Sequence, residues 1–230
     1  MSGKSYLGIV SHYEACLSRH GDSHLGVDWA SAADAEKRYQ VMLDLVTGLA
    51  DPKREVSLLD FGCGVSHLLT HLRKRNVDNV RYVGLDISPE FLKASGEKYP
   101  EIEYLSMDIL DDDATLPDFD FIVMNGVFTE KCTLSFNEMF DYFRAVVRKV
   151  YPHCRKAMAF NLRSKQVEKE DDDLFHLSLD DCAWFLAGEI SRHFTIRQDY
   201  GLEEYTVYLY TAPRSAGPYG VGVDAAAAEV

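Results

Sequence analysis

The chain has 230 residues, 47% of them hydrophobic, and a formal net charge of −13 at pH 7. This length and composition predict one domain with a single large core. The acidic charge argues against a protein that binds nucleic acid by neutralising phosphates, because that requires clustered Lys and Arg. Met1–Tyr6 does not read as a secretion signal, and no apolar run is long enough to span a membrane, so we expect a cytoplasmic protein without a membrane partner.

Two amphipathic helices are predicted before the first strand, over residues 4–19 and 31–49. Ser31 is a suitable N-cap for the second helix, with Asp34 in its first turn. The loop between the helices contains Trp29 and two glycines. A loop of this composition can fold over a bound ligand.

A glycine-rich turn follows the first predicted strand, within the segment 58–69. Gly62 and Gly64 let the backbone approach a ligand where a side chain would clash. The helix that begins near Ser66 presents unpaired N–H groups toward the turn. The next strand ends at Asp86, a carboxylate placed to accept both ribose hydroxyls of an adenosine.

Asp60 and the glycine spacing distinguish between two adenosine-bearing cofactors. A dinucleotide-binding turn reads G-x-G-x-x-G and accepts a pyrophosphate, whereas no third glycine follows Gly64 at a common spacing. Asp60 lies two residues before Gly62, where it would repel a pyrophosphate but suits the ammonium of an amino acid. The pattern therefore indicates S-adenosylmethionine rather than NAD, and hence methyl transfer.

Further strands continue the alternation of strands and helices. They are predicted at 103–105, 119–126 and 157–161, and a closing β-hairpin at 194–200 and 204–211. Strands joined by helices predict a parallel sheet with ligands at the carboxyl ends of the strands. The terminal antiparallel pair is typical of a methyltransferase sheet and not of a dehydrogenase sheet.

Together these motifs resemble the class I S-adenosylmethionine-dependent methyltransferases over about residues 55–211. Similarity to a largely uncharacterised bacterial group of that class rests on the segments 20–23, 26–29, 38–39, 125–128, 160–161, 199–200 and 204–206. The resemblance implies an α/β, Rossmann-like class I methyltransferase fold, with a seven-stranded, mainly parallel sheet, a C-terminal antiparallel hairpin and a helical N-terminal cap. It implies one domain over 1–211, with the cap in 1–54, the core in 55–211 and a flexible tail in 212–230.

The strand ends and the resemblance also assign cofactor contacts. The candidates in the core are Asp60, Gly62, Cys63, Gly64, Asp86, Ile87, Met107, Asp108, Asn125 and Gly126. Asp108 is expected to accept a hydrogen bond from the adenine amine. In the cap, Trp29 and Arg38 are expected to form a lid with Tyr13, in which Arg38 pairs with the cofactor carboxylate. The alternative is that Trp29 only pins the helices to the core and that Arg38 is a surface charge.

Methyl transfer is an in-line displacement from an already activated sulfonium, so the protein chiefly aligns the reactants. The acceptor is expected between the ends of the fourth and fifth strands, the hairpin and the cap. His12 and His176 are considered as general bases, as is His20, because imidazole titrates near neutrality. The catalytic candidates are His12, Asn125, Asn161 and Tyr200, and the substrate-binding candidates are Tyr13, Phe128, His176 and Glu204.

A metal site is not expected. Cys16, His20 and His24 are spaced to share a helix face, but Gly21 is expected to end the helix before His24, and the cysteines have no CxxC spacing. The sequence therefore predicts methyl transfer to an O or N atom of a small molecule, with no nucleic-acid partner. Two alternatives stay open: methylation of protein or RNA with a partner subunit, and a catalytically inactive adenosylmethionine-binding protein. The oligomeric state does not follow from the sequence.

Overall fold

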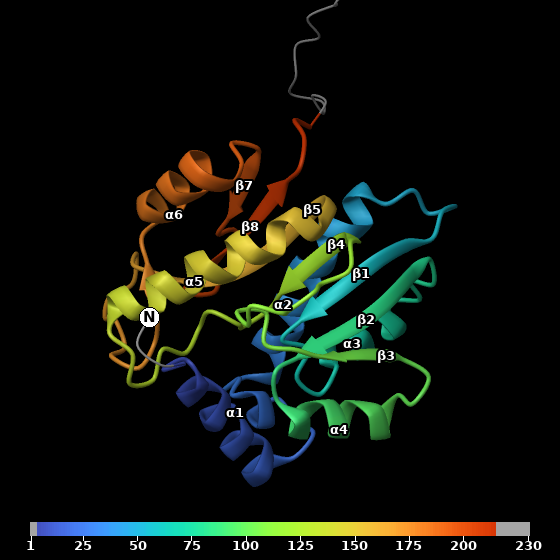
Figure 1. Cartoon of the computed structure of the whole chain (residues 1–230), viewed down its shortest axis with the longest axis horizontal. Coiled ribbons are helices and arrows are strands. Elements are labelled where there is room, and N and C mark those ends of the chain that lie inside the picture. The colour runs from blue at the N-terminus through green and yellow to red at the C-terminus, as the bar shows by residue number, and fades with distance from the viewer. Residues whose placement is uncertain (1–3, 215–230) are drawn as a thin grey trace, which may run out of the picture.

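The computed structural model describes residues 4–214, which form one sheet with helices on both of its faces (Figure 1). The strands are β1 Val56–Phe61, β2 Val80–Asp86, β3 Glu103–Ser106, β4 Phe119–Met124, β5 Cys154–Ser164, β6 His176–Leu177, β7 Phe194–Arg197 and β8 Glu204–Tyr210. The helices are α1 Leu7–His20, α2 Ala32–Leu49, α3 His67–Lys74, α4 Pro89–Lys98, α5 Phe136–Val150 and α6 Leu179–Phe185, with short helical turns at Leu25–Val27, Tyr151–His153 and Leu186–Ile190.

The strand order is β3-β2-β1-β4-β5-β8-β7, with β6 pairing separately with β5. Strands β1 to β5 pair in parallel, and β8 is antiparallel to both β5 and β7. The predicted mainly parallel sheet with a terminal antiparallel hairpin is therefore confirmed. The eighth strand, β6, was not predicted, because two residues are too few to give a periodic pattern.

Both faces of the sheet are covered, which explains why β1 is buried along its whole length. Helices α5 and α6 pack on one face, and α2 and α3 pack on the other. Helix α5 begins with a capping box, in which Ser135 and Glu138 satisfy each other's backbone N–H groups. The two apolar faces hold the carboxyl ends of the strands in fixed positions beneath the cap.

Helix α1 lies beside α4 at the carboxyl ends of the central strands (Figure 1). It starts at Leu7 and ends at His20, where Gly21 adopts a φ of 60°. Ser31 caps α2 as predicted, since its Oγ accepts the Asp34 N–H at 3.2 Å. Within residues 4–214 no helix is both long and apolar enough to cross a membrane. Most of the predicted tail, from residue 215 onward, falls outside the described residues.

Candidate active site

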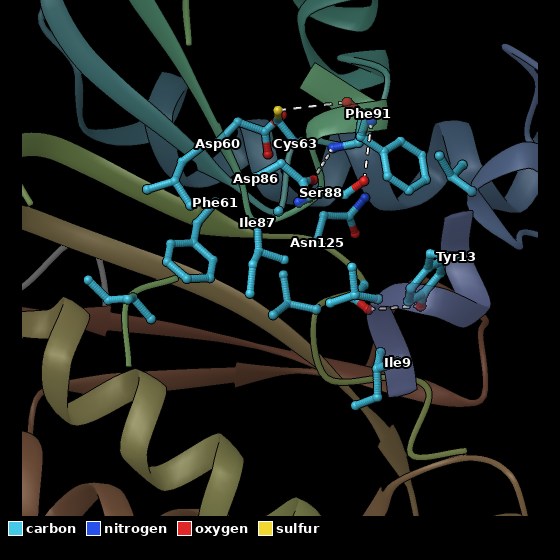
Figure 2. Close-up of a pocket in the computed structure, with 18 of the residues that line it drawn as sticks. Ile9, Tyr13, Asp60, Phe61, Cys63, Asp86, Ile87, Ser88, Phe91 and Asn125 are labelled. Atoms are coloured by element: carbon cyan, nitrogen blue, oxygen red, sulfur yellow. Dashed lines mark hydrogen bonds between the residues drawn. The ribbon is translucent and has the colours of Figure 1, made fainter. Parts of the chain in front are cut away.

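A cleft of about 1090 Å³, its open mouth included, lies where α1 crosses the carboxyl ends of β1, β2 and β4. Figure 2 shows side chains from the glycine turn, from the end of β2 and from α1 converging on it. Every core residue predicted to contact the cofactor lines this cleft: Asp60, Gly62, Cys63, Gly64, Asp86, Ile87, Met107, Asp108, Asn125 and Gly126. The predicted cofactor residues of the core therefore lie together along one cleft.

The turn after β1 adopts a backbone that requires glycine. Gly62 and Gly64 have φ values of 72° and 54°, and a Cβ on Gly62 would lie 2.7 Å from a methyl group of Val127. The Gly64 N–H donates to the Asp86 carboxylate at 2.9 Å. The turn is therefore tied to the end of β2, and this bond fixes the shape of the cleft floor.

Two buried carboxyl groups face the floor of the cleft. Asp86 accepts the N–H groups of Gly64 and Ser88, one on each oxygen, and Asp60 accepts the Tyr82 hydroxyl at 2.7 Å. Burial raises the pKa of Asp60 to about 7 and that of Asp86 to about 6, although these hydrogen bonds oppose the shift. Both groups therefore stand to gain from a bound cation, and each ionised carboxylate keeps lone pairs for a ligand.

The far end of the cleft is lined by Ile87, Met107 and Asp108. Asp108 accepts hydrogen bonds from the Lys4 ammonium at 2.8 Å and from the Tyr6 hydroxyl at 2.7 Å. The Tyr6 ring stacks on Tyr142 from α5, with a centroid distance of 5.0 Å. Adenine is planar and largely apolar, and its amine needs a hydrogen-bond acceptor. Apolar side chains beside the Asp108 carboxylate provide such surroundings at this end of the cleft.

The cap closes the cleft from the opposite side, although not as the lid hypothesis predicted. The Tyr13 hydroxyl donates to the Gly126 carbonyl at 3.3 Å, and Trp29 packs so closely on Gly126 that a Cβ there would lie 2.7 Å from the indole. Arg38 is absent from the lining as described, because its guanidinium is paired with Glu204 at 2.8 Å and stacked over Trp29. The surface-charge alternative is also wrong, since Arg38 is 8% exposed.

Asn125 is positioned at the end of β4 and lines the cleft. Its Oδ1 is buried and has no hydrogen-bond partner among residues 4–214. A buried amide oxygen without a partner is costly unless a ligand donates to it. The neighbouring Gly126 N–H donates to Asn161 Oδ1 at 2.8 Å, which holds this segment in place.

Three further acceptor-side candidates bond to one another instead of facing the cleft. Glu204 accepts from Arg38, from the Asn161 amide at 3.2 Å and from the Tyr200 hydroxyl at 3.4 Å. We call Arg38, Asn161, Tyr200 and Glu204 the β5–β8 network. Asn161 and Glu204 are each 1% exposed, so their hydrogen-bonding capacity is used inside the protein.

Two predicted substrate contacts are core residues in the structure. Phe128 is fully buried and packs edge-on against Phe143 and Phe160. His176 lies in β6, where its Nδ1 donates to the Ser164 carbonyl at 2.6 Å and its Nε2 accepts the Asp171 N–H at 3.2 Å. Both ring nitrogens are therefore occupied, and neither residue lines the cleft as the structure describes it.

His12 also lies away from the described lining, although it is adjacent to Tyr13 in α1. Its Nε2 is 2.7 Å from Asp28 and 3.9 Å from the Cys16 sulfur. Its neighbour Tyr13 does line the cleft, as predicted. Position on the helix therefore separates these adjacent residues, because successive side chains on a helix point in different directions.

The sequence analysis missed several lining residues. They are Tyr6, Ile9, Val10, Val27, Tyr39, Phe61, His67, Phe91 and Tyr142, among others. Glu14 was also missed: it accepts the Ser88 hydroxyl at 2.6 Å beside Asp86. Most of these residues belong to helix faces, and only the position of each helix over the strand ends shows which face meets the cleft.

The residues present fit an adenosylmethionine molecule. The glycine turn leaves space close to the backbone, two carboxyl groups face the cleft floor, and the unpartnered Asn125 oxygen needs a donor. The predicted assignment, in which Asp86 would hold the ribose hydroxyls and Asp60 the ammonium group, uses two carboxylates that both line this cleft. A carboxylate also favours the positive sulfonium, because opposite charges in a partly desolvated pocket attract strongly.

Comparisons with known proteins agree with this geometry. A model of the methyltransferase domain family matches residues 59–157. A search of curated proteins found no match. Magnesium protoporphyrin IX methyltransferase (ChlM) from Synechocystis PCC 6803, solved with bound SAM, superposes with a TM-score of 0.63 at 12% identity, covering 92% of this chain and 99% of that one.

Two further solved structures illustrate the range of similar proteins. The 1,6-didemethyltoxoflavin-N1-methyltransferase of Burkholderia thailandensis has a TM-score of 0.58 at 14% identity, covering 91% of each chain. The small RNA methyltransferase HEN1 has a TM-score of 0.56 at 16% identity, covering 80% of this chain and 26% of that one. At these identities the likenesses show a shared fold. The methyltransferase domain match over residues 59–157, the shared fold and the cleft described above indicate a class I S-adenosylmethionine-dependent methyltransferase domain in this part of the chain.

Proposed function

We propose that the enzyme methylates an oxygen or nitrogen atom of a small molecule, which binds beside Asn125 and Tyr13. The observation that carries this proposal is the buried Asn125 Oδ1, which has no partner in the described chain and lies on the wall of the cofactor cleft. An amide oxygen there can accept a hydrogen bond from a hydroxyl or amine and so orient the lone pair of the acceptor atom toward the methyl group.

The enclosure of the cleft supports a small acceptor. Helix α1 and Trp29 cover it, and the lining is mostly apolar with a few polar groups, as in small-molecule sites. Similar proteins include enzymes named for a porphyrin and for a toxoflavin precursor. No covalent nucleophile is required, because the bound sulfonium supplies an activated methyl group and the chain's residues align the acceptor and exclude water.

A second candidate function is adenosylmethionine binding without catalysis. The acceptor was predicted to bind beside the residues of the β5–β8 network and Phe128. These side chains instead contact other residues of the protein. If the residual space beside Asn125 admits no acceptor, the protein binds the cofactor and does not turn it over.

The first test is calorimetric titration with S-adenosylhomocysteine, S-adenosylmethionine and NAD. Both adenosyl ligands should bind and NAD should not, and Asp86→Ala should weaken binding about 100-fold, or about 2.7 kcal/mol, because two hydroxyl contacts to a charged group are lost. Asp112→Ala removes an exposed carboxylate and serves as the control. Equal binding by both variants would refute the assigned cofactor position.

The second test identifies the acceptor class. Purified enzyme is incubated with cell extract and methyl-labelled S-adenosylmethionine, and the label is followed into small-molecule, RNA and protein fractions. Label in the small-molecule fraction that disappears with Asn125→Ala supports the proposal. Label in RNA or protein supports the partner-dependent alternative, and cofactor binding without label in any fraction supports the non-catalytic one.

A further inference from the structure

His12, Cys16 and Asp28 bring three metal-ligating groups together on the outer side of the cap. The His12 Nε2, the Cys16 Sγ and an Asp28 carboxylate oxygen all lie within 4.8 Å of one another. This set differs from the one suggested by the sequence, in which Cys16 was combined with His20 and His24. Helix α1 ends at His20, and His24 instead bonds to the Trp29 carbonyl, so the partner of Cys16 is His12, one turn earlier.

Local structure holds the three groups in place. His12 and Cys16 are four residues apart on α1 and therefore share one face. Asp28 follows the short helical turn Leu25–Val27 and has a left-handed backbone with φ of 58°. An aspartate tolerates this conformation better than most residues. The geometry points its carboxylate at His12.

The separations among the three groups are close to those between the ligand atoms of a small thiophilic cation. The His12 Nε2 is 2.7 Å from the Asp28 oxygen and 3.9 Å from the Cys16 sulfur. A tetrahedral Zn²⁺ with bonds of about 2.0–2.3 Å holds its ligand atoms roughly 3.3–3.6 Å apart. The Cys16 sulfur and the Asp28 oxygen lie within 4.8 Å of each other. A shared ion would therefore require His12 and Asp28 to separate by about 0.6 Å and Cys16 to move closer to both, with the metal replacing the proton between His12 and Asp28.

The charges of the site also suit a divalent cation. A Cys16 thiolate, an Asp28 carboxylate and a neutral His12 sum to −2, which one Zn²⁺ neutralises. Arg19 donates to the Cys16 sulfur at 3.4 Å, a contact that favours the thiolate, whereas burial raises the pKa of this thiol, so the ion has to displace its proton. A water is available as the fourth ligand.

We propose that His12, Cys16 and Asp28 form a Zn²⁺ site that joins α1 to the segment carrying Val27 and Trp29. Those two residues line the cofactor cleft, so the ion would fix part of the cleft wall without touching the cofactor. The site is independent of the proposed acceptor, and its test needs no turnover.

The test is a titration of reduced, chelator-treated protein with Co²⁺, followed by displacement with Zn²⁺. The expected result is one equivalent of Co²⁺ bound with a thiolate-to-cobalt charge-transfer band, and slower amide hydrogen exchange in α1 and residues 21–29. Cys16→Ser should abolish the band, and His12→Gln should weaken Zn²⁺ at least about 10-fold, because even loss of an outer-shell partner costs roughly that much.

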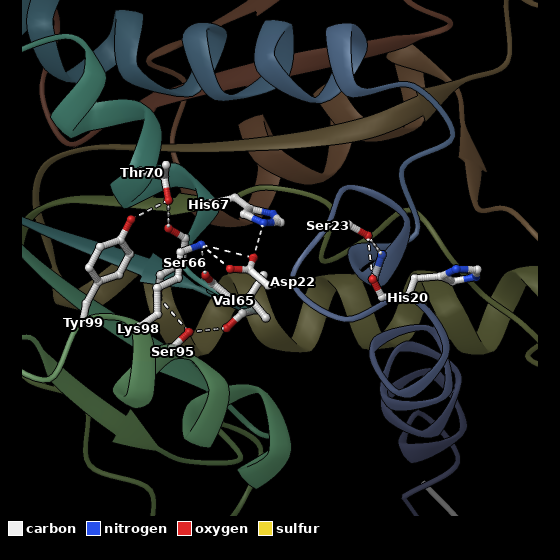
Figure 3. Close-up of polar contacts among 12 residues, drawn as sticks. His20, Asp22, Ser23, Val65, Ser66, His67, Thr70, Ser95, Lys98 and Tyr99 are labelled. Carbon is white, nitrogen blue, oxygen red and sulfur yellow. Dashed lines mark hydrogen bonds and ion pairs between the residues drawn. The ribbon is translucent and has the colours of Figure 1, made fainter.

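Matched controls separate this site from other thiols and imidazoles. Cys154→Ser changes a buried thiol in β5 that bonds to the Asp120 carbonyl, and His20→Gln changes an exposed imidazole at the end of the same helix (Figure 3). Neither should alter the titration. Absence of the charge-transfer band in the wild type, or its persistence in Cys16→Ser, would reduce the cluster to a His–Asp ion pair beside a thiol.

Discussion

Along the edge of the sheet formed by the strand ends, polar residues have different roles at β1, β2 and β4 and at β5 and β8. At β1, β2 and β4, Asp60, Asp86 and Asn125 face an open cleft, and the Asn125 Oδ1 has no partner among the described residues. At β5 and β8, the β5–β8 network satisfies its polar groups internally, and its Arg38, Asn161 and Glu204 are buried. A polar residue at a strand end therefore faces the cleft only where its neighbours leave part of its hydrogen-bonding capacity unused.

The largest effect is expected from a change in the buried β5–β8 network. Glu204→Gln leaves the Arg38 guanidinium buried without a counter-charge and should lower the free energy of unfolding by about 3–5 kcal/mol. Glu203→Gln is the matched control, because the pair of Glu203 with Arg163 is partly exposed and is worth less than about 1 kcal/mol. Urea denaturation measures both variants, and similar losses would mean that the buried network stabilises no more than a surface pair.

A second change tests the contact between cap and cleft. Gly126 has a φ of 84°, and a Cβ would lie 2.7 Å from Trp29, so Gly126→Ala should cost about 1–3 kcal/mol of stability and weaken cofactor binding. Gly96→Ala places its Cβ in open space within α4 and should instead stabilise by about 0.5–1 kcal/mol. Thermal unfolding distinguishes the two, and a stabilising Gly126→Ala would contradict the observed packing of Trp29.

A third prediction concerns pH on the open side. Burial raises the pKa of Asp60 to about 7 and that of Asp86 to about 6, and a bound cation would lower both values again. Cofactor affinity should therefore rise with pH and level off above about 7, with a loss of up to about tenfold per unit below 6 for each proton released. Asp60→Asn should remove the step near 7 and retain the step near 6 in calorimetric titrations. An affinity that does not change between pH 5 and 8 would rule out ionised carboxylates as the cofactor's partners.

The same shifts predict how the free protein responds to pH. Both carboxyl groups have folded pKa values above the ordinary value of 3.8, so their contribution to stability is full below pH 4 and is lost as the pH rises toward 7. Asp60→Asn should therefore leave the free protein at least as stable as the wild type at pH 8. Denaturation of both proteins at pH 5 and pH 8 measures this. A clear loss at pH 8 would show that ionised Asp60 stabilises the fold.

The smallest expected effect is at the polar contacts between the cap loop and the core. Asp22 accepts from His67 at 2.7 Å and from Lys98 at 2.9 Å, which joins the loop after α1 to α3 and α4 (Figure 3). Burial alone would raise the pKa of Asp22, but Lys98 and His67 outweigh it and hold the pKa below its usual value. Asp22→Asn should cost less than about 1 kcal/mol, because the carboxylate is half exposed.

The effect of Asp22→Asn is measured in the loop itself, because Val27 and Trp29 of this loop line the cleft. Asp22→Asn should speed amide hydrogen exchange in residues 21–29 and the release of the cofactor. Asp34→Asn, which removes an exposed pair with Lys37 on α2, should change neither rate. Unchanged exchange in Asp22→Asn would mean that other contacts hold the loop.

The sequence predicted the strands, and it predicted cofactor residues that lie along one cleft, because their signals are local. The apolar runs, the glycine turn and Asp86 lie within one β-α-β unit, and each needs only its neighbours to be interpreted. Ser31 was recognised as an N-cap for the same reason. The family match over residues 59–157 covers this same local part of the chain.

The acceptor side was not predictable in this way, because its contacts join distant segments. Arg38 and Glu204 are 166 residues apart, and His12 meets Asp28 only because the chain reverses after α1. Nothing near Phe128 in the sequence shows that Phe143 and Phe160 will enclose it. The roles of these residues depend on three-dimensional packing. The sequence assigned the residues to the cleft only because their side chains are polar or aromatic.

The position of Trp29 against Gly126 also provides a spectroscopic probe. The chain has two tryptophans: Trp29 is 8% exposed on the cleft wall, and Trp184 is 79% exposed on α6. Their emission should differ, with Trp29 at shorter wavelength because its indole is shielded from water. In a Trp184→Phe variant the remaining fluorescence would come from the cleft alone, so ligand entry could be followed in real time without any attached dye.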